Sequence, residues 1–136
     1  MRLHRTLLLG LFLLAPTLAL AANPHFSGTP TITAENNTLT ACGSINGLGN
    51  ADVTIELSAI ATVQCINRGG TPPPGQKVTV QGSVSGLNPK NGNLDFCVST
   101  ARISNPCPDG MRFTATFSNV TLRVIQNGRT VLTYSQ

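Results

Sequence analysis

The chain has 136 residues, of which only 10% are charged, and its formal net charge is +4. This length suits one domain with a single hydrophobic core and argues against several domains. The basic residues beyond the N-terminal segment stand singly, without the cluster or stripe of a nucleic-acid-binding protein, so we expect no nucleic-acid partner.

The N-terminal 22 residues have the three parts of a secretory signal peptide. A basic start is followed by an apolar run over residues 6–14, and Ala19-Leu20-Ala21 matches the small-residue pattern of a signal-peptidase site. The apolar run is shorter than the about 20 residues that a membrane-spanning helix needs. We therefore expect cleavage that leaves Ala22 or Asn23 at the mature N-terminus, a secreted (extracellular or periplasmic) protein, and no membrane span after cleavage.

Residues 23–136 alternate between apolar and polar side chains with period two, interrupted by Gly, Pro and Asn. About seven short strands are predicted, with turn signals at roughly ten-residue spacing. In chain order they cover residues 29–33, 39–45, 53–65, 77–84, 94–98, 113–124 and a segment after residue 128. The pattern predicts a single all-β domain: an antiparallel β-sandwich of immunoglobulin-like architecture.

The last two predicted strands carry information about their register. Apolar residues fall on odd numbers up to Phe117 and on even numbers from Val120, which predicts a bulge near Ser118-Asn119. Asn127-Gly128 predicts a two-residue hairpin turn of type I′, because both residues tolerate positive φ. We expect this turn to place Val124 opposite Val131.

Four cysteines in an exported chain predict two disulfides. If the strands alternate in direction, all four cysteines come near one end of the domain, so distance excludes none of the three possible pairings. Cys97 alternates with the inward-facing Phe96 and points away from it. This parity favours Cys65–Cys107 with Cys42–Cys97, narrowly over Cys42–Cys65 with Cys97–Cys107.

Two segments rich in Gly and Pro, residues 67–75 and 104–110, interrupt the strand pattern. We expect them to be exposed loops, joined by the disulfides into one rigid surface. The predicted partner-binding residues are Arg68, Thr71, Pro72, Pro73, Pro74, Asn105, Pro106 and Pro108.

The sequence contains no recognisable constellation for catalysis, a metal or a cofactor. His25 is the one histidine of residues 23–136, and its position near the predicted mature N-terminus suits a general base poorly. Asp52 and Glu56 share a polar strand face but are four residues apart, as expected of solvated surface charges. Asn36 and Asn119 begin N-glycosylation sequons, which matter only in a host that glycosylates exported proteins.

One stretch resembles a pattern in small exported bacterial β-rich proteins of unknown function. The likeness is carried by Val63–Gly70, by the Pro74-Gly75-Gln76 that follows, and by Cys107-Pro108. It covers roughly the region from Gly47 to Arg129. It implies a bacterial exported protein and brings no activity, ligand or partner with it.

These observations favour a secreted non-enzymatic β-domain that acts in binding, in adhesion, or in extracellular or envelope structure. Its expected partner is an extracellular or cell-surface macromolecule. The first alternative is a secreted enzyme inhibitor that presents the rigid loop around Pro72-Pro73-Pro74. The second, less favoured, is a small hydrolase.

Overall fold

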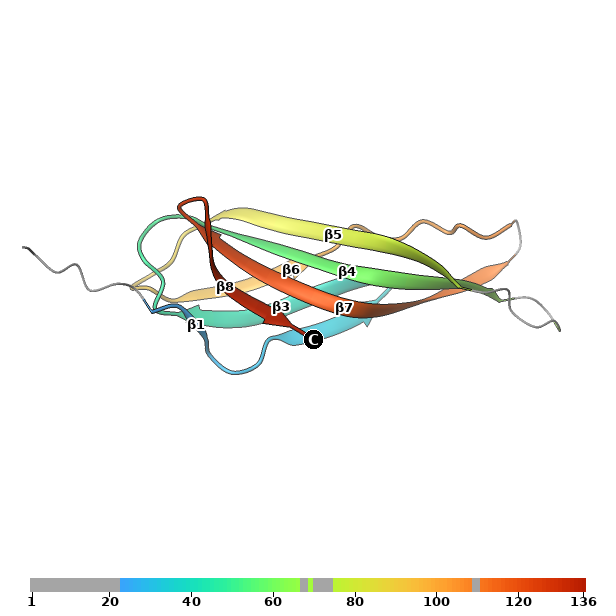
Figure 1. Ribbon diagram of the computed structural model, residues 1–136, viewed down its shortest axis with the longest axis horizontal. Helices are drawn as coiled ribbons and strands as arrows, with labels where there is room; N and C mark the ends of the chain where they lie inside the picture. Colours follow the sequence, from blue (N-terminus) through green and yellow to red (C-terminus); the bar gives the residue numbers. More distant parts are fainter. Residues whose placement is uncertain (1–22, 67–68, 70–74, 109–110) are drawn as a thin grey trace, which may run out of the picture.

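The computed structural model describes residues 23–66, 69, 75–108 and 111–136, so the predicted signal peptide lies outside the described residues. The described residues form eight strands and no helix. The strands make two antiparallel sheets that pack on one shared core (Figure 1). The predicted all-β sandwich is therefore confirmed. Over the described ranges, no helix suitable for crossing a membrane occurs.

Sheet A is organised around one central strand. β3 pairs on one edge with β1 and then β2, and on its other edge with β6. The strands are β1 (His25–Phe26), β2 (Thr31–Glu35), β3 (Thr38–Asn46) and β6 (Leu94–Ser99). Both edges of β3 are thus paired, which makes it the best protected strand of this sheet.

Sheet B contains the longest strands, in the order β5-β4-β7-β8. They are β4 (Val53–Ile66), β5 (Gln76–Leu87), β7 (Arg112–Gln126) and β8 (Arg129–Ser135). β8 pairs only with residues 121–126 of β7, whereas β4 pairs with β7 over almost its full length. Because β4, β5 and β7 are longer than the strands of sheet A, sheet B extends past sheet A at one end (Figure 1).

The period-two pattern of β4 is reproduced as alternating burial along its length. Ile55, Leu57 and their neighbours on the inner face are almost fully buried, and Leu122 and Val124 of β7 are 0% exposed. Phe26 adds an aromatic contact between the sheets, since its ring lies 6.4 Å from that of Phe96 and 6.1 Å from that of Tyr134. Burial of this apolar surface is the main force that holds the two sheets together.

Three tight turns in the fold share one backbone feature, two successive residues at positive φ. Asn127-Gly128 joins β7 to β8 with both residues at positive φ, which confirms the predicted hairpin turn. Asn36-Asn37, between β2 and β3, and Asn91-Gly92, before β6, also have two successive positive φ angles. Asparagine and glycine are the residues that adopt this backbone at the least cost.

The bulge predicted near Ser118-Asn119 is confirmed. Ser58 of β4 lies opposite Thr121 and Ile60 opposite Ser118, so two residues of β7 face Ala59 alone. Asn119 occupies the extra position with a φ of 50°. The bulge lets the odd-numbered apolar residues before it and the even-numbered ones after it face the same core.

The predicted pairing of Val124 with Val131 is wrong. Val124 lies opposite Leu132 and Leu122 lies opposite Tyr134, because the ladder shifts by one residue between Val124 and the turn. Val131 is the extra residue of this second bulge. The shift brings Leu132 and Tyr134 to the inner face, where both pack against the core.

Both favoured disulfides, Cys42–Cys97 and Cys65–Cys107, are present. Cys42 and Cys97 are direct cross-strand neighbours in the middle of the β3–β6 ladder, on the outer face of sheet A. The other bond joins the C-terminal end of β4, in sheet B, to the coil after β6. The pairing is as predicted, but the bonds lie in different parts of the fold and not together at one end.

Candidate functional site

The end of sheet B that extends past sheet A has an inner face that is only partly covered. We call it the distal end: residues 61–66 of β4, 76–80 of β5 and 112–117 of β7. Val63 and Val80 on its inner face are buried, but Val78 is 45% exposed. An exposed large aliphatic side chain beside buried ones indicates an incompletely covered apolar surface.

A coil of residues 100–108 lies against this surface in the place of a strand (Figure 1, orange). Thr100 fixes its start, because the Thr100 N–H donates to the Leu39 carbonyl at 2.9 Å. Farther along, the Ala101 N–H donates to the Gln81 carbonyl at 3.0 Å, and the Ile103 N–H donates to the Asn37 carbonyl at 3.0 Å. The coil is therefore attached to both sheets.

The Cys65–Cys107 disulfide holds the far end of the coil. Cys65 lies at the end of β4, and the bond fixes Cys107 at a Cα–Cα distance of 5.7 Å. Asn105 shapes the chain just before the bond, since its side-chain oxygen accepts from the Cys107 N–H at 2.9 Å and its amide donates to the Met111 carbonyl at 3.2 Å. The coil is thus preformed, without regular secondary structure of its own.

Between the coil and β5 lies a hollow of about 540 Å³, which we call the β5 groove. Its walls are residues 76–81 of β5 with Val63, and residues 101–104 of the coil with Pro106. Val78, Ile103 and Pro106 give it an apolar surface. Its volume falls in the range of about 300–1,000 Å³ that is usual for ligand sites in proteins.

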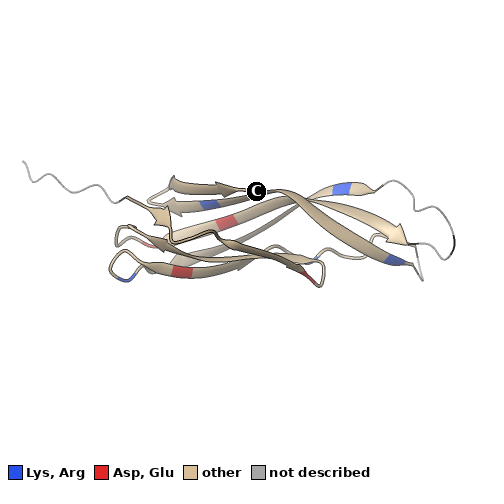
Figure 2. Cartoon of the chain, turned by 90° about the horizontal axis from the view of Figure 1, so that it is seen from below, with Lys and Arg blue, Asp and Glu red and all other residues tan. Residues whose placement is uncertain are grey.

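The charge of the β5 groove has one sign. Lys77 and Arg102 both line it, and no acidic residue does so among the residues that the structure describes. Figure 2 shows how sparsely charges are placed on this molecule, with Lys and Arg residues at separate positions along it. Two cations at the border of one apolar groove concentrate positive charge beside it, which suits an anionic group on a ligand.

The structure describes only some of the predicted partner-binding residues. Arg68 and the segment Thr71, Pro72, Pro73 and Pro74 lie outside the described residues. Asn105, Pro106 and Pro108 are exposed on the coil. Pro106 lines the β5 groove, whereas Asn105 lines a smaller hollow of about 300 Å³ on the other side of the coil, beside Phe113.

The sequence analysis did not single out Val78, Ile103, Lys77 or Arg102. Val78 follows the same alternation as the core residue Val80, so its exposure depends on the path of the coil and not on its own strand. Lys77 and Arg102 are 25 positions apart, and only the folded chain brings them to one groove. The one signal that the sequence offered for this groove was Ile103, an isolated isoleucine between polar residues in a segment that contains proline.

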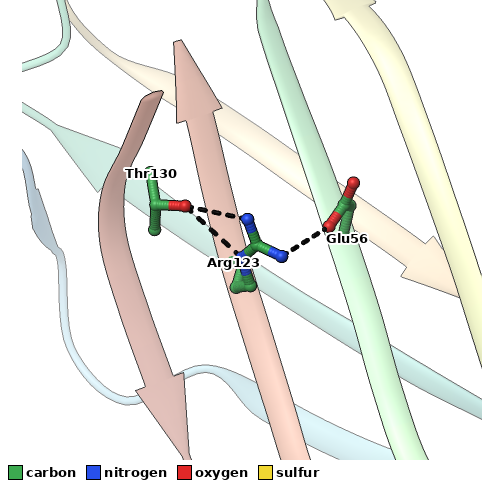
Figure 3. Close-up of polar contacts among 3 residues, drawn as sticks. All are labelled: Glu56, Arg123 and Thr130. Atoms are coloured by element: carbon green, nitrogen blue, oxygen red, sulfur yellow. Dashed lines mark hydrogen bonds and ion pairs between the residues drawn. The ribbon is translucent and has the colours of Figure 1, made fainter. Parts of the chain in front are cut away.

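A second hollow, of about 390 Å³, lies over the outer face of sheet B. Arg123 crosses it: its guanidinium lies 3.3 Å from the Glu56 carboxylate and also donates to the Thr130 hydroxyl (Figure 3). The Arg123 and Glu56 side chains are 48% and 44% exposed, so this ion pair contributes little to stability. The charges compensate each other, which leaves this face less suited than the β5 groove to a charged ligand.

The residues considered for catalysis do not converge. His25 is exposed and its ring contacts the Asn23 carbonyl at 3.0 Å, while Glu56 is paired with Arg123 on another strand. Asp52 lies exposed before β4. Over the described parts of the chain, no group of three or more His, Cys, Asp or Glu side chains is placed to hold a metal ion.

No family model, curated protein or solved structure matches this chain. The geometry of the β5 groove is therefore the basis for a functional interpretation.

Proposed function

We propose that this protein is a secreted, non-enzymatic β-domain that acts by binding an extracellular or cell-surface macromolecule, in adhesion or as part of extracellular or envelope structure. The observation that carries the proposal is the β5 groove, in which Val78 remains 45% exposed beside a coil fixed by a disulfide. A preformed groove loses little conformational entropy when a partner binds. The two disulfides support an oxidising compartment.

Site-specific photocrosslinking tests this proposal. A photoreactive amino acid at Val78 lies in the groove, and the matched control at Thr133 is exposed on β8, away from it. With the protein exported by its own producer, irradiation of the Val78 variant should yield an adduct of higher mass that the Thr133 variant lacks. Absence of an adduct at Val78, or equal adducts at both positions, contradicts the proposal.

Export itself has a direct readout. If the N-terminal segment is a signal peptide, material recovered outside the cytoplasm begins at Ala22 or Asn23. N-terminal sequencing that finds Met1 in exported material contradicts this part of the proposal.

The hydrolase alternative is tested with peptide, ester and glycoside substrates. We expect no turnover by the purified protein. A measurable rate that disappears in His25→Ala or Asp52→Asn would overturn the non-enzymatic assignment. The inhibitor alternative depends on the loop around Pro72-Pro73-Pro74, which lies outside the described residues, and no described contact favours it.

A further inference from the structure

The strand that forms one wall of the β5 groove has an open edge. β5 pairs with β4 alone, and no strand pairs with its other side among the described residues. The Gln81 carbonyl accepts a hydrogen bond from Ala101 on that other side, so the peptide groups of Gln81 point outward. Alternate residues of an antiparallel strand present their N–H and C=O to the same side. The peptide groups of Lys77 and Thr79 therefore face the open edge as well.

These outward peptide groups have no backbone partner within the described residues. An exposed strand edge is a template on which another extended chain can pair. The edge at Lys77 and Thr79 borders the groove, because both residues line it together with Val78. A chain that paired here would lie directly beside the apolar surface.

The side chains around this edge indicate which residue types the added strand should contain. Val78 faces the inner side of β5 and Lys77 the opposite side, since successive side chains of a strand alternate. An added strand alternates in the same way. Its apolar residues would contact Val78 and Ile103 in the groove, while acidic residues would lie near Lys77 and Arg102.

We infer that the β5 groove takes an extended acidic segment of a partner protein, which adds as a strand to the open edge of β5 and places alternate apolar side chains against Val78 and Ile103. This inference rests on the proposed binding function and names the chemistry of its partner. A fatty acid would match the apolar surface and the cations, but it has no peptide groups for the edge at Thr79. Strand addition uses both features.

The test uses the full exported chain with both disulfides formed and a fluorescent decapeptide of alternating valine and glutamate. The structure predicts saturable binding by fluorescence anisotropy. Two control peptides should bind at least about tenfold more weakly: one with lysine in place of glutamate, and one with N-methylated backbone positions that cannot pair as a strand.

Two pairs of variants locate the binding on the protein. Thr79→Pro removes the outward N–H and should weaken binding about tenfold, whereas Thr79→Ala, which keeps this N–H, should not. Arg102→Glu should weaken binding by a similar factor of about ten, whereas Arg129→Glu, on the β7–β8 hairpin, should not. If Thr79→Pro fails to fold by circular dichroism, the N-methylated peptide decides the question of strand pairing.

Three results overturn the inference: no binding of the valine–glutamate peptide, equal binding of its N-methylated form, or binding of oleate in place of the peptide. Each of them is distinct from a failure of the proposed function. An adduct at Val78 in the crosslinking experiment would still establish the groove as a binding site for a partner of another chemistry.

Discussion

Leu122 and Val78 are both aliphatic residues on the inner face of sheet B, yet Leu122 is 0% exposed and Val78 is 45% exposed. Around Leu122, two sheets face each other and side chains from both fill the space between them. Around Val78, the opposing layer is the coil of residues 100–108, attached by a few hydrogen bonds and the Cys65–Cys107 disulfide. One half of this sandwich is therefore closed by packing between two sheets, while the distal end is closed by a coil that a covalent bond holds in place.

The largest effect is expected for a cavity in the packed half. Leu122→Ala should lower the free energy of unfolding by about 4 kcal/mol, because a fully buried leucine is lost and its surroundings cannot collapse into the space. The matched change Val78→Ala at the distal end should cost less than about 1 kcal/mol. Urea unfolding followed by circular dichroism measures both values, and equal losses would contradict the division into two halves.

Removing one disulfide should distinguish the two halves by their hydrogen-exchange protection. Cys65→Ala with Cys107→Ala should cost about 3 kcal/mol. It should also abolish hydrogen-exchange protection at the Ala101 and Ile103 amides while protection in β3 and β6 persists. Cys42→Ala with Cys97→Ala should cost a similar amount but leave those two amides protected. If protection at Ala101 and Ile103 is lost in both double variants, the coil does not depend specifically on the Cys65–Cys107 disulfide, and the expectation is contradicted.

A smaller effect is expected at the border of the two halves, where the coil begins. A Cβ added to Gly82 would overlap the Ser99 carbonyl oxygen, a backbone atom that cannot rotate away. Gly82→Ala should therefore destabilise the protein by about 2 kcal/mol, as overpacking does. Gly49→Ala is the control, since its nearest neighbours are 3.7 Å away. Equal thermal stability of Gly82→Ala and the wild type would show that the coil can shift freely on β5.

The smallest effect is expected on the outer face of sheet B. Glu56→Gln and Arg123→Ala, alone and combined, should give a coupling free energy below about 1 kcal/mol that decreases further at high salt. A coupling above about 2 kcal/mol in a double-mutant cycle would show that this exposed pair stabilises the fold as much as a buried contact does.

Much of the fold could be predicted because it follows from side-chain alternation. The strand around Leu57, the bulge at Asn119 and the turn at Asn127-Gly128 all leave a local mark on the sequence. The second bulge leaves none: Val131 and Leu132 are both apolar and both pack against the core, so side-chain alternation does not fix the register at this point.

The candidate site was predicted only in part for a related reason. Proline marks Pro106 as a rigid coil residue, and this residue does line the groove. The apolar and cationic groups beside it come from a strand and from a coil whose path depends on long-range contacts, such as that of Ile103 with Asn37. Local patterns carry no information about such a path.

If the chain is exported as proposed, the order of its disulfides along the sequence has a consequence for how the protein matures. Cys42 bonds to the third cysteine and Cys65 to the fourth, so the two covalent loops overlap. A chain that enters an oxidising compartment N-terminus first exposes Cys42 and Cys65 before either correct partner has arrived. Oxidation in order of emergence would join these two and trap the chain in a wrong connectivity. Efficient maturation therefore calls for delayed oxidation or for thiol–disulfide exchange by an isomerase.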